Sequence, residues 1–259
     1  MLGWSINLFR VRGIQLTLHF SFVILPAYAA YVGYEEAGMA GLVWSVALLF
    51  AFFVCVVLHE FGHSLVALHF GVGVSRILLL PIGGMAQFDS IPRQPARELL
   101  ITVAGPAVNF AIAAVLLPFV SFPKGWQLSS YPSSPGDFAR YILIANLIMG
   151  VFNLLPAFPM DGGRILRALL ATKLPYLRAT FWAAAIGKVL SFAGFVAAIW
   201  AQSYFLAALF AFIFFVGEAE YRALLRRDRE DARWRRVLAE YEAIRATNPP
   251  SDEPPILTK

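Results

Sequence analysis

The sequence has little cysteine and little charge. Its single cysteine, Cys55, excludes an intramolecular disulfide framework and a zinc cluster built from several cysteines. Charged residues make up 14% of the 259 residues, whereas 59% are apolar and the mean hydropathy is +0.68. Soluble domains are about 45–50% apolar, so this composition excludes a disordered chain and an ordinary cytosolic enzyme. It predicts a polytopic membrane protein.

A basic patch with interleaved aromatic residues is also missing, although the net charge is +5. Residues 1–217 carry this whole excess, because residues 218–259 hold nine basic and nine acidic side chains. The positive charge therefore belongs to the loops of an apolar chain, and no nucleic-acid partner is expected.

Six apolar stretches approach the roughly 20 residues that a helix needs to cross a bilayer. They lie near residues 17–34, 41–68, 98–122, 138–158, 180–200 and 202–217. The expected fold class is an all-α polytopic membrane protein with about six transmembrane helices. No A-x-A cleavage pattern follows a short apolar core at the start of the chain, so no removable signal peptide is expected.

The basic residues predict the direction of these spans. If the N-terminus lies in the cytoplasm, Lys124 and Arg140 are the only basic residues on the outer side of the membrane, and Lys188 falls within a span. The other 18 fall inside: Arg10, Arg12, Arg76, Arg93, Arg97, Arg164, Arg167, Lys173, Arg178 and nine in residues 218–259. By the positive-inside rule, we expect a multi-pass protein of the cell membrane with both termini cytoplasmic.

Residues 72–88, VGVSRILLLPIGGMAQF, are too short to cross a membrane. Pro81 and Gly83-Gly84 interrupt any helix, so the pattern favours two short strands around a Gly-Gly turn. Strands are not tolerated in contact with lipid, so this element must lie against protein or at the interface. An interfacial loop is the alternative.

The sharpest motif is His59-Glu60-Phe61-Gly62-His63 in the second apolar stretch. Two histidines at i and i+4 share one helix face and can bind one zinc ion, and the glutamate after the first can act as general base toward a metal-activated water. Buried histidines without metal are the alternative. This alternative is weak because ionisable residues at this depth in a membrane are costly and usually functional.

A third protein ligand is needed, and no acidic residue occurs between His63 and Asp89. The candidate is Asp161 in FNLLPAFPMDGGR (152–164), where two prolines end the fourth helix and two glycines permit a sharp turn. An aspartate that only caps the next helix is the alternative. The two histidines lie about 10–16 Å below the cytoplasmic surface, and Asp161 approaches the same surface.

These motifs resemble the site-2 protease family of intramembrane zinc metalloproteases, over roughly residues 10–170. HEFGH, LLLPIGGMAQF, AGPAVNF (104–110) and FNLLPAFPMDGGR follow the family's order, closest to the short branch with the sporulation pro-sigma-factor proteases and archaeal members. The resemblance implies one zinc ion held by His59, His63 and Asp161. It also implies Glu60 as the catalytic base, Asn153 as a residue that positions substrate or supports the oxyanion, and residues 72–88 as a hairpin near the active site.

The expected organisation has three parts. Residues 1–217 form a transmembrane metalloprotease core, residues 218–247 a charged cytoplasmic helix, and residues 248–259 a disordered tail. No stretch is long enough for the PDZ domain that many relatives carry, and the last 42 residues are too few for a pair of CBS domains. The sequence therefore does not identify a regulatory partner.

Other polar residues are expected to have structural roles. Cys55 is predicted to be a small core residue, and Asn109 and Asn146 are predicted to hydrogen-bond between helices. Lys188 lies in the fifth stretch and either snorkels to the interface or faces a hydrated cleft.

The function expected is proteolysis in or beside the transmembrane segment of a single-span membrane protein. An anti-sigma factor or a membrane-bound transcription factor is the kind of substrate that the resemblance implies. Two alternatives stay open. One is a transporter or an inactive metal-binding membrane protein, which has no need of Glu60 as a base. The other is a zinc protease of the prenyl-protein type, which would take a downstream glutamate as ligand in place of Asp161.

Overall fold

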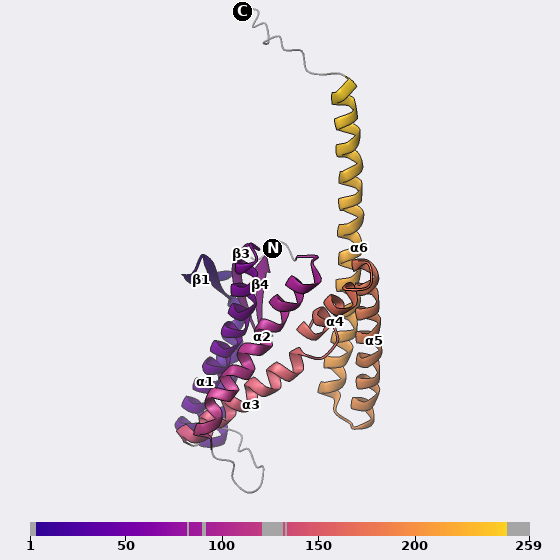
Figure 1. Cartoon of the computed structure of the whole chain (residues 1–259). Coiled ribbons are helices and arrows are strands. Elements are labelled where there is room, and N and C mark those ends of the chain that lie inside the picture. The colour runs from indigo at the N-terminus through magenta and orange to yellow at the C-terminus, as the bar shows by residue number, and fades with distance from the viewer. Residues whose placement is uncertain (1–3, 82, 90–91, 121–131, 133, 248–259) are drawn as a thin grey trace, which may run out of the picture.

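Figure 1 shows the computed structural model, which describes residues 4–81, 83–89, 92–120, 132 and 134–247. The helices are α1 (Ile24–His69), α2 (Pro95–Leu116), α3 (Pro135–Asn153), α4 (Asp161–Ala171), α5 (Tyr176–Trp200) and α6 (Tyr204–Thr247). The strands are β1 (Ser5–Val11), β2 (Ile14–His19), β3 (Val74–Leu80) and β4 (Gly83–Phe88). Two 3₁₀ turns, η1 (Phe20–Val23) and η2 (Leu117–Phe119), flank α1 and α2.

Four helical stretches are long and apolar enough to cross a membrane: Phe20–His69, Pro95–Phe119, Tyr176–Trp200 and Tyr204–Ile244. The first contains two expected spans, because the backbone is not helical at Ala37 and Gly38 and the chain folds back there. A Cβ on Gly33 would collide with the carbonyl of Gly41, which a straight helix would hold about 12 Å away. With α3 as the fourth stretch, the helix count agrees with the expected six.

The boundaries expected at the two ends of the apolar part differ from the structure. The first stretch was expected to be helical from residue 17, but residues 17–19 belong to β2 and η1 follows. Ile14, Leu16 and Thr17 of this strand are buried, so pairing within a sheet prevails over the local apolar run. At the other end, α6 continues without a break past Gly217 to Thr247, and its charged half projects beyond the other elements (Figure 1). The expected disordered tail, residues 248–259, lies outside the described residues.

The sheet has the order β1-β2-β3-β4. β3 and β4 form the antiparallel hairpin that the sequence predicted, but Gly83 and Gly84 open β4 and pair with Leu80 and Leu79 instead of forming the turn. The two N-terminal strands were not predicted. β2 runs parallel to β3 and antiparallel to β1, which leaves β4 as an edge strand.

The sheet packs on the end of α1 that follows the histidines. Ile14, Leu16, Ile77 and Leu79 form a buried cluster with Ala67 of α1, which fixes β4 beside that helix. The prolines were expected to end the fourth stretch, placed near residues 138–158, and α3 ends before both of them, at Asn153. Seven irregular residues lead from there to α4. The second half of α1, the start of α4 and the middle of α2 thereby meet inside the molecule.

Candidate metal centre

His59 and His63 lie one helical turn apart on α1, and both side chains are buried. Their Nε2 atoms are 3.1 Å apart, with the ring planes nearly perpendicular. The i, i+4 spacing alone places both on one face of the helix. The structure adds that their Nε2 atoms point to a common position.

Asp161 completes this group from the first turn of α4. Its Oδ2 lies 3.3 Å from His59 Nε2 and 3.2 Å from His63 Nε2, and the residue is also buried. Gly162 and Gly163 were expected to permit a sharp turn, but neither has a positive φ. A Cβ at either position would instead collide with the backbone of residues 154–158, so the glycines let α4 start in close contact with that segment.

The donor set fits a tetrahedral zinc ion. Ligand atoms about 2.0–2.1 Å from a tetrahedral metal are about 3.3 Å from one another, and the three separations here are 3.1–3.3 Å. The buried Asp161 Oδ2 has no hydrogen-bond partner among the described residues. A carboxylate oxygen and two imidazole nitrogens at this separation are compatible with a cation between them.

The other nitrogen of His59 is fixed by a chain of amides. His59 Nδ1–H donates to Asn109 Oδ1 (2.6 Å), Asn109 Nδ2 donates to Asn146 Oδ1 (2.9 Å), and Asn146 Nδ2 donates to the carbonyl of Ile142 (2.8 Å). A carbonyl can only accept, so it sets the orientation of both amides and the tautomer of His59. The Nε2 lone pair is then directed to the metal position.

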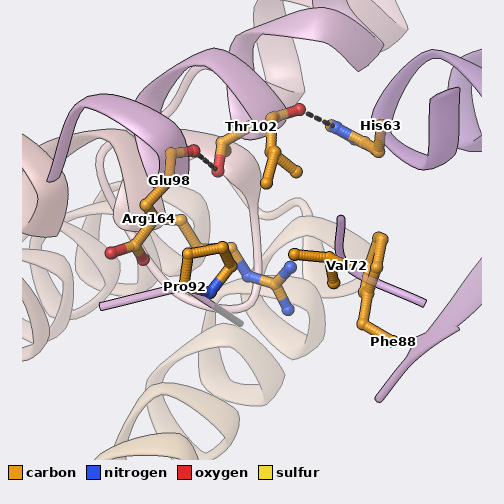
Figure 2. Close-up of a pocket in the computed structure, with 8 residues that line it drawn as sticks. His63, Val72, Phe88, Pro92, Glu98, Thr102 and Arg164 are labelled. Carbon is orange, nitrogen blue, oxygen red and sulfur yellow. Dashed lines mark hydrogen bonds between the residues drawn. The ribbon is translucent and has the colours of Figure 1, made fainter. Parts of the chain in front are cut away.

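His63 is fixed in the same sense by a backbone group. Its Nδ1–H donates to the carbonyl of Ile101 at 2.8 Å, a contact drawn in Figure 2. Asn109 and Asn146 do bond between helices, as predicted, but no local pattern in the sequence connects Asn109 with His59. The signal in the sequence is an amide within an apolar helix, and the structure shows that this amide is fully buried and so needs a polar partner.

Gly105 allows α2 to approach the histidines. A Cβ at this position would overlap the imidazoles of both His63 and His59, and a Cβ on Gly62 of α1 would meet the carbonyl of Ala104 at 2.8 Å. Small residues at such crossings let membrane helices pack closely. The AGPAVNF segment therefore supplies both the space for the imidazoles and, through Asn109, the partner of His59.

Glu60 points to the sheet. Its Oε2 accepts a hydrogen bond from the backbone N–H of Ala86 in β4 at 3.1 Å, and its side chain is half-buried. A Cβ on Gly84 would lie 2.7 Å from Glu60 Cγ, so this glycine gives the glutamate room. The predicted base thus lies between the histidines and the edge strand.

Asn153 stands apart from these contacts. It is the last residue of α3, and its Nδ2 donates to the carbonyl of Met149 at 3.0 Å within the same helix. It lies at the start of the irregular segment that leads to Asp161.

A buried ion pair ties α4 to α2. Arg167 Nε donates to Glu98 Oε1 at 2.8 Å, Arg167 Nη2 contacts the same oxygen, and both residues are at most 2% exposed. The guanidinium also stacks on the rings of Phe158 and Tyr176. No local pattern in the sequence indicates this pair, which joins the helix that carries Asp161 to the helix that orients both histidines.

Figure 2 shows a small cavity beside this ion pair, lined by His63, Glu98, Thr102 and Arg164 among others. Its volume of about 20 Å³ suits a single water molecule. Glu98 Oε2 and Arg164 Nε are both buried without a hydrogen-bond partner among the described residues.

Two further predictions concern Cys55 and Lys188. Cys55 is buried in α1, as a small core residue would be. Lys188 donates from Nζ to Glu218 Oε2 of α6 at 2.8 Å, and its side chain is 30% exposed on the wall of a groove, which is compatible with the hydrated cleft of the prediction.

Comparisons with known proteins identify relatives of this chain. Residues 47–133 and 129–194 match the model of peptidase family M50. A zinc metalloprotease of Methanocaldococcus jannaschii is 42% identical over 224 residues, which are 86% of this chain and 62% of that protein. Rip3 of Mycobacterium tuberculosis is 30% identical over 204 residues, 72% of this chain and 49% of its own length.

Stage IV sporulation protein FB of Bacillus subtilis is 30% identical over 125 residues, 48% of this chain and 40% of that protein. The chain thus spans about half of the length of these relatives. The structure of a site-2 protease from Methanocaldococcus jannaschii superposes with a TM-score of 0.61 at 39% identity, covering 84% of this chain and 95% of the other. This chain is a multi-pass membrane protein that belongs to peptidase family M50, the site-2 protease family.

Proposed function

We propose that this chain is a zinc-dependent intramembrane endopeptidase, which hydrolyses a peptide bond within or beside the transmembrane segment of a single-span membrane protein. The observation that carries the proposal is the convergence of the His59, His63 and Asp161 donor atoms with Glu60 alongside. Regulated release of a transcription factor or removal of an anti-sigma factor is the process that fits such an activity.

The chemistry requires an activated water and a base. One zinc ion per chain, held by the three converging donors, would leave one position for water, lower the pKa of that water to about 7 and polarise the scissile carbonyl. Glu60 accepts the proton of the attacking water and passes it to the leaving amine. The N–H of Ala86 supports this role because it holds the carboxylate beside the histidines.

Asn153 is proposed to support the carbonyl oxygen that becomes negative during attack. One N–H of its amide is used within α3, and the second N–H remains for substrate. Its position at the end of α3, where the irregular segment that leads to Asp161 begins, supports this assignment.

The edge strand β4 supplies a means of holding an unwound substrate. A transmembrane helix hides its carbonyls in its own hydrogen bonds, so the segment to be cut must become extended. Ala86 directs its N–H to Glu60, away from β3, so the free edge of β4 faces the proposed base. An extended segment that pairs with this edge would pass beside Glu60.

We propose that both termini lie in the cytoplasm and that the chain resides in the cell membrane. The sheet, the start of α2 and the charged half of α6 lie toward one end of the molecule (Figure 1). The basic residues of those elements therefore share one side, which supports the distribution expected from the positive-inside rule.

The variant Glu60→Gln distinguishes the proposed protease from the alternative, a carrier or an inactive metal-binding protein. Glutamine has nearly the shape of glutamate but cannot accept the proton at neutral pH. The variant should keep its zinc, about one per chain, and lose about 10²–10⁴-fold in cleavage rate. The assay follows candidate single-span proteins by fragment size after co-expression, with metal content measured on the same preparation. Cleavage at the wild-type rate by a zinc-loaded variant would show that Glu60 is not the base.

A further inference from the structure

A groove lined by residues of α5 and α6 shares no lining residue with the candidate metal centre. Its volume is about 700 Å³, and its wall includes Lys188 of α5 together with Phe214, Phe215, Glu218, Arg222 and Arg226 of α6. The α6 residues come from four successive turns, so the groove follows one stripe of that helix.

The groove carries a net positive charge. Glu218 accepts a hydrogen bond from Lys188 Nζ at 2.8 Å through Oε2 and one from Arg222 Nε at 2.7 Å through Oε1. One carboxylate is therefore shared by two cations. Arg226 is exposed and makes no ion pair with any described residue. Three basic groups against one acid leave an excess of two positive charges.

The groove also crosses the expected edge of the hydrocarbon layer. Trp200 and Tyr204 are 89% and 72% exposed at the end of α5 and the start of α6, where aromatic residues mark a membrane interface. A hydrocarbon layer of about 30 Å corresponds to about 20 helical residues, which places the opposite boundary near residue 224 of α6. Phe214 and Phe215 then lie at acyl-chain depth, and Arg222 and Arg226 lie at headgroup depth.

We propose that this groove binds an anionic phospholipid of the leaflet on the side of the charged half of α6. The lipid phosphate lies between the Arg222 and Arg226 guanidiniums, and an acyl chain lies along the two phenylalanines. A soluble anion would use the arginines but not the aromatic wall. A zwitterionic lipid would bring a choline group for which the groove offers only the already shared Glu218 carboxylate.

The test uses the whole chain in detergent and measures retention of phosphatidylglycerol against phosphatidylcholine by native mass spectrometry. Arg226→Gln should weaken phosphatidylglycerol binding about fivefold, the equivalent of about 1 kcal/mol per arginine near a lipid surface. The double variant Arg222→Gln/Arg226→Gln should weaken it further.

The matched control is Arg227→Gln. Arg227 neighbours Arg226 at the same depth on the same helix, but it lines the cleft on the side of β4. Diffuse attraction between the helix and anionic lipid would make both single variants equal, and that outcome would overturn the proposal. A selective loss in Arg226→Gln supports it.

Two more measurements close the remaining alternatives. Inorganic phosphate at millimolar concentration should not displace phosphatidylglycerol, and efficient displacement would identify a phosphate site that does not require the lipid. Equal monodispersity and thermal unfolding of the variants should accompany the difference, because Arg226 and Arg227 are both exposed. These readouts do not depend on proteolytic activity, so the proposed function can fail without affecting this inference.

Discussion

His59 donates a hydrogen bond from Nδ1 to Asn109 Oδ1 at 2.6 Å, across the contact between α1 and α2. The acceptor is itself held by Asn146, which is anchored on the carbonyl of Ile142. The metal-facing nitrogen of His59 is therefore oriented by three residues on two other helices. Such hydrogen-bond partners orient the metal ligands, and replacing one typically lowers metal affinity or activity by about 10–100-fold.

Asn109→Leu should lower zinc affinity by about 10–100-fold, because His59 loses the acceptor that fixes its ring and tautomer. Competition with a chelator followed by metal analysis measures the change. Asn146→Leu is the graded control, since it frees the Asn109 amide without removing the acceptor, and its effect should be smaller. Equal affinity in Asn109→Leu and the wild type would mean that this hydrogen bond does not orient the ligand.

Gly105→Ala should abolish or strongly reduce zinc binding. The added Cβ would overlap both imidazoles, although alanine is otherwise the better helix former. Gly136→Ala is the control, because a Cβ there meets only the Ser134 hydroxyl at an ordinary 3.9 Å. If Gly105→Ala bound zinc as tightly as the Gly136 control, the close approach of α2 would not be required.

Arg167→Met should destabilise the protein by about 3–5 kcal/mol, because the Glu98 carboxylate would stay buried without its cation. Replacing both residues, as in Glu98→Leu/Arg167→Met, should restore most of the stability. Thermal and denaturant unfolding in detergent distinguishes the two. A double variant as unstable as the single one would show that the ion pair itself, and not the orphaned charge, sets the stability.

Reporter fusions test the orientation. A fusion at Lys259 and a fusion within residues 123–137 should report opposite sides of the membrane, with the former cytoplasmic. The physical reason is the 18 basic residues on one side of the six-span arrangement and the two on the other. A C-terminal reporter active on the outer side would contradict the arrangement.

Patterns that depend on neighbours along the chain could be predicted. The apolar stretches predicted the helices, the HEFGH spacing predicted one shared face for His59 and His63, and the prolines predicted the end of α3 near Asn153. The hairpin of β3 and β4 was also predictable from its interrupted, β-prone run. Each of these signals is local, because helix periodicity and backbone restriction act over a few residues.

The strands β1 and β2 could not be recognised in the same way. β2 is too short to carry a distinct alternation, and it is stabilised by parallel pairing with β3, about 60 residues away. The apolar run that continues into α1 therefore looked like the start of a span. The partner of Lys188 could not be predicted for a similar reason, since Glu218 belongs to another helix.

The sequence by itself determined that the chain crosses a membrane and that a histidine pair with an adjacent glutamate lies on one helix, because composition and i, i+4 spacing are properties of the chain. Only the tertiary structure decided which groups surround that pair. Asn109 and the Ile101 carbonyl come from α2, the Ala86 N–H comes from β4, and Asp161, which the sequence named as the third ligand, comes from α4. They meet because buried polar groups must find partners inside the bundle, and which partners are within reach depends on how the helices pack.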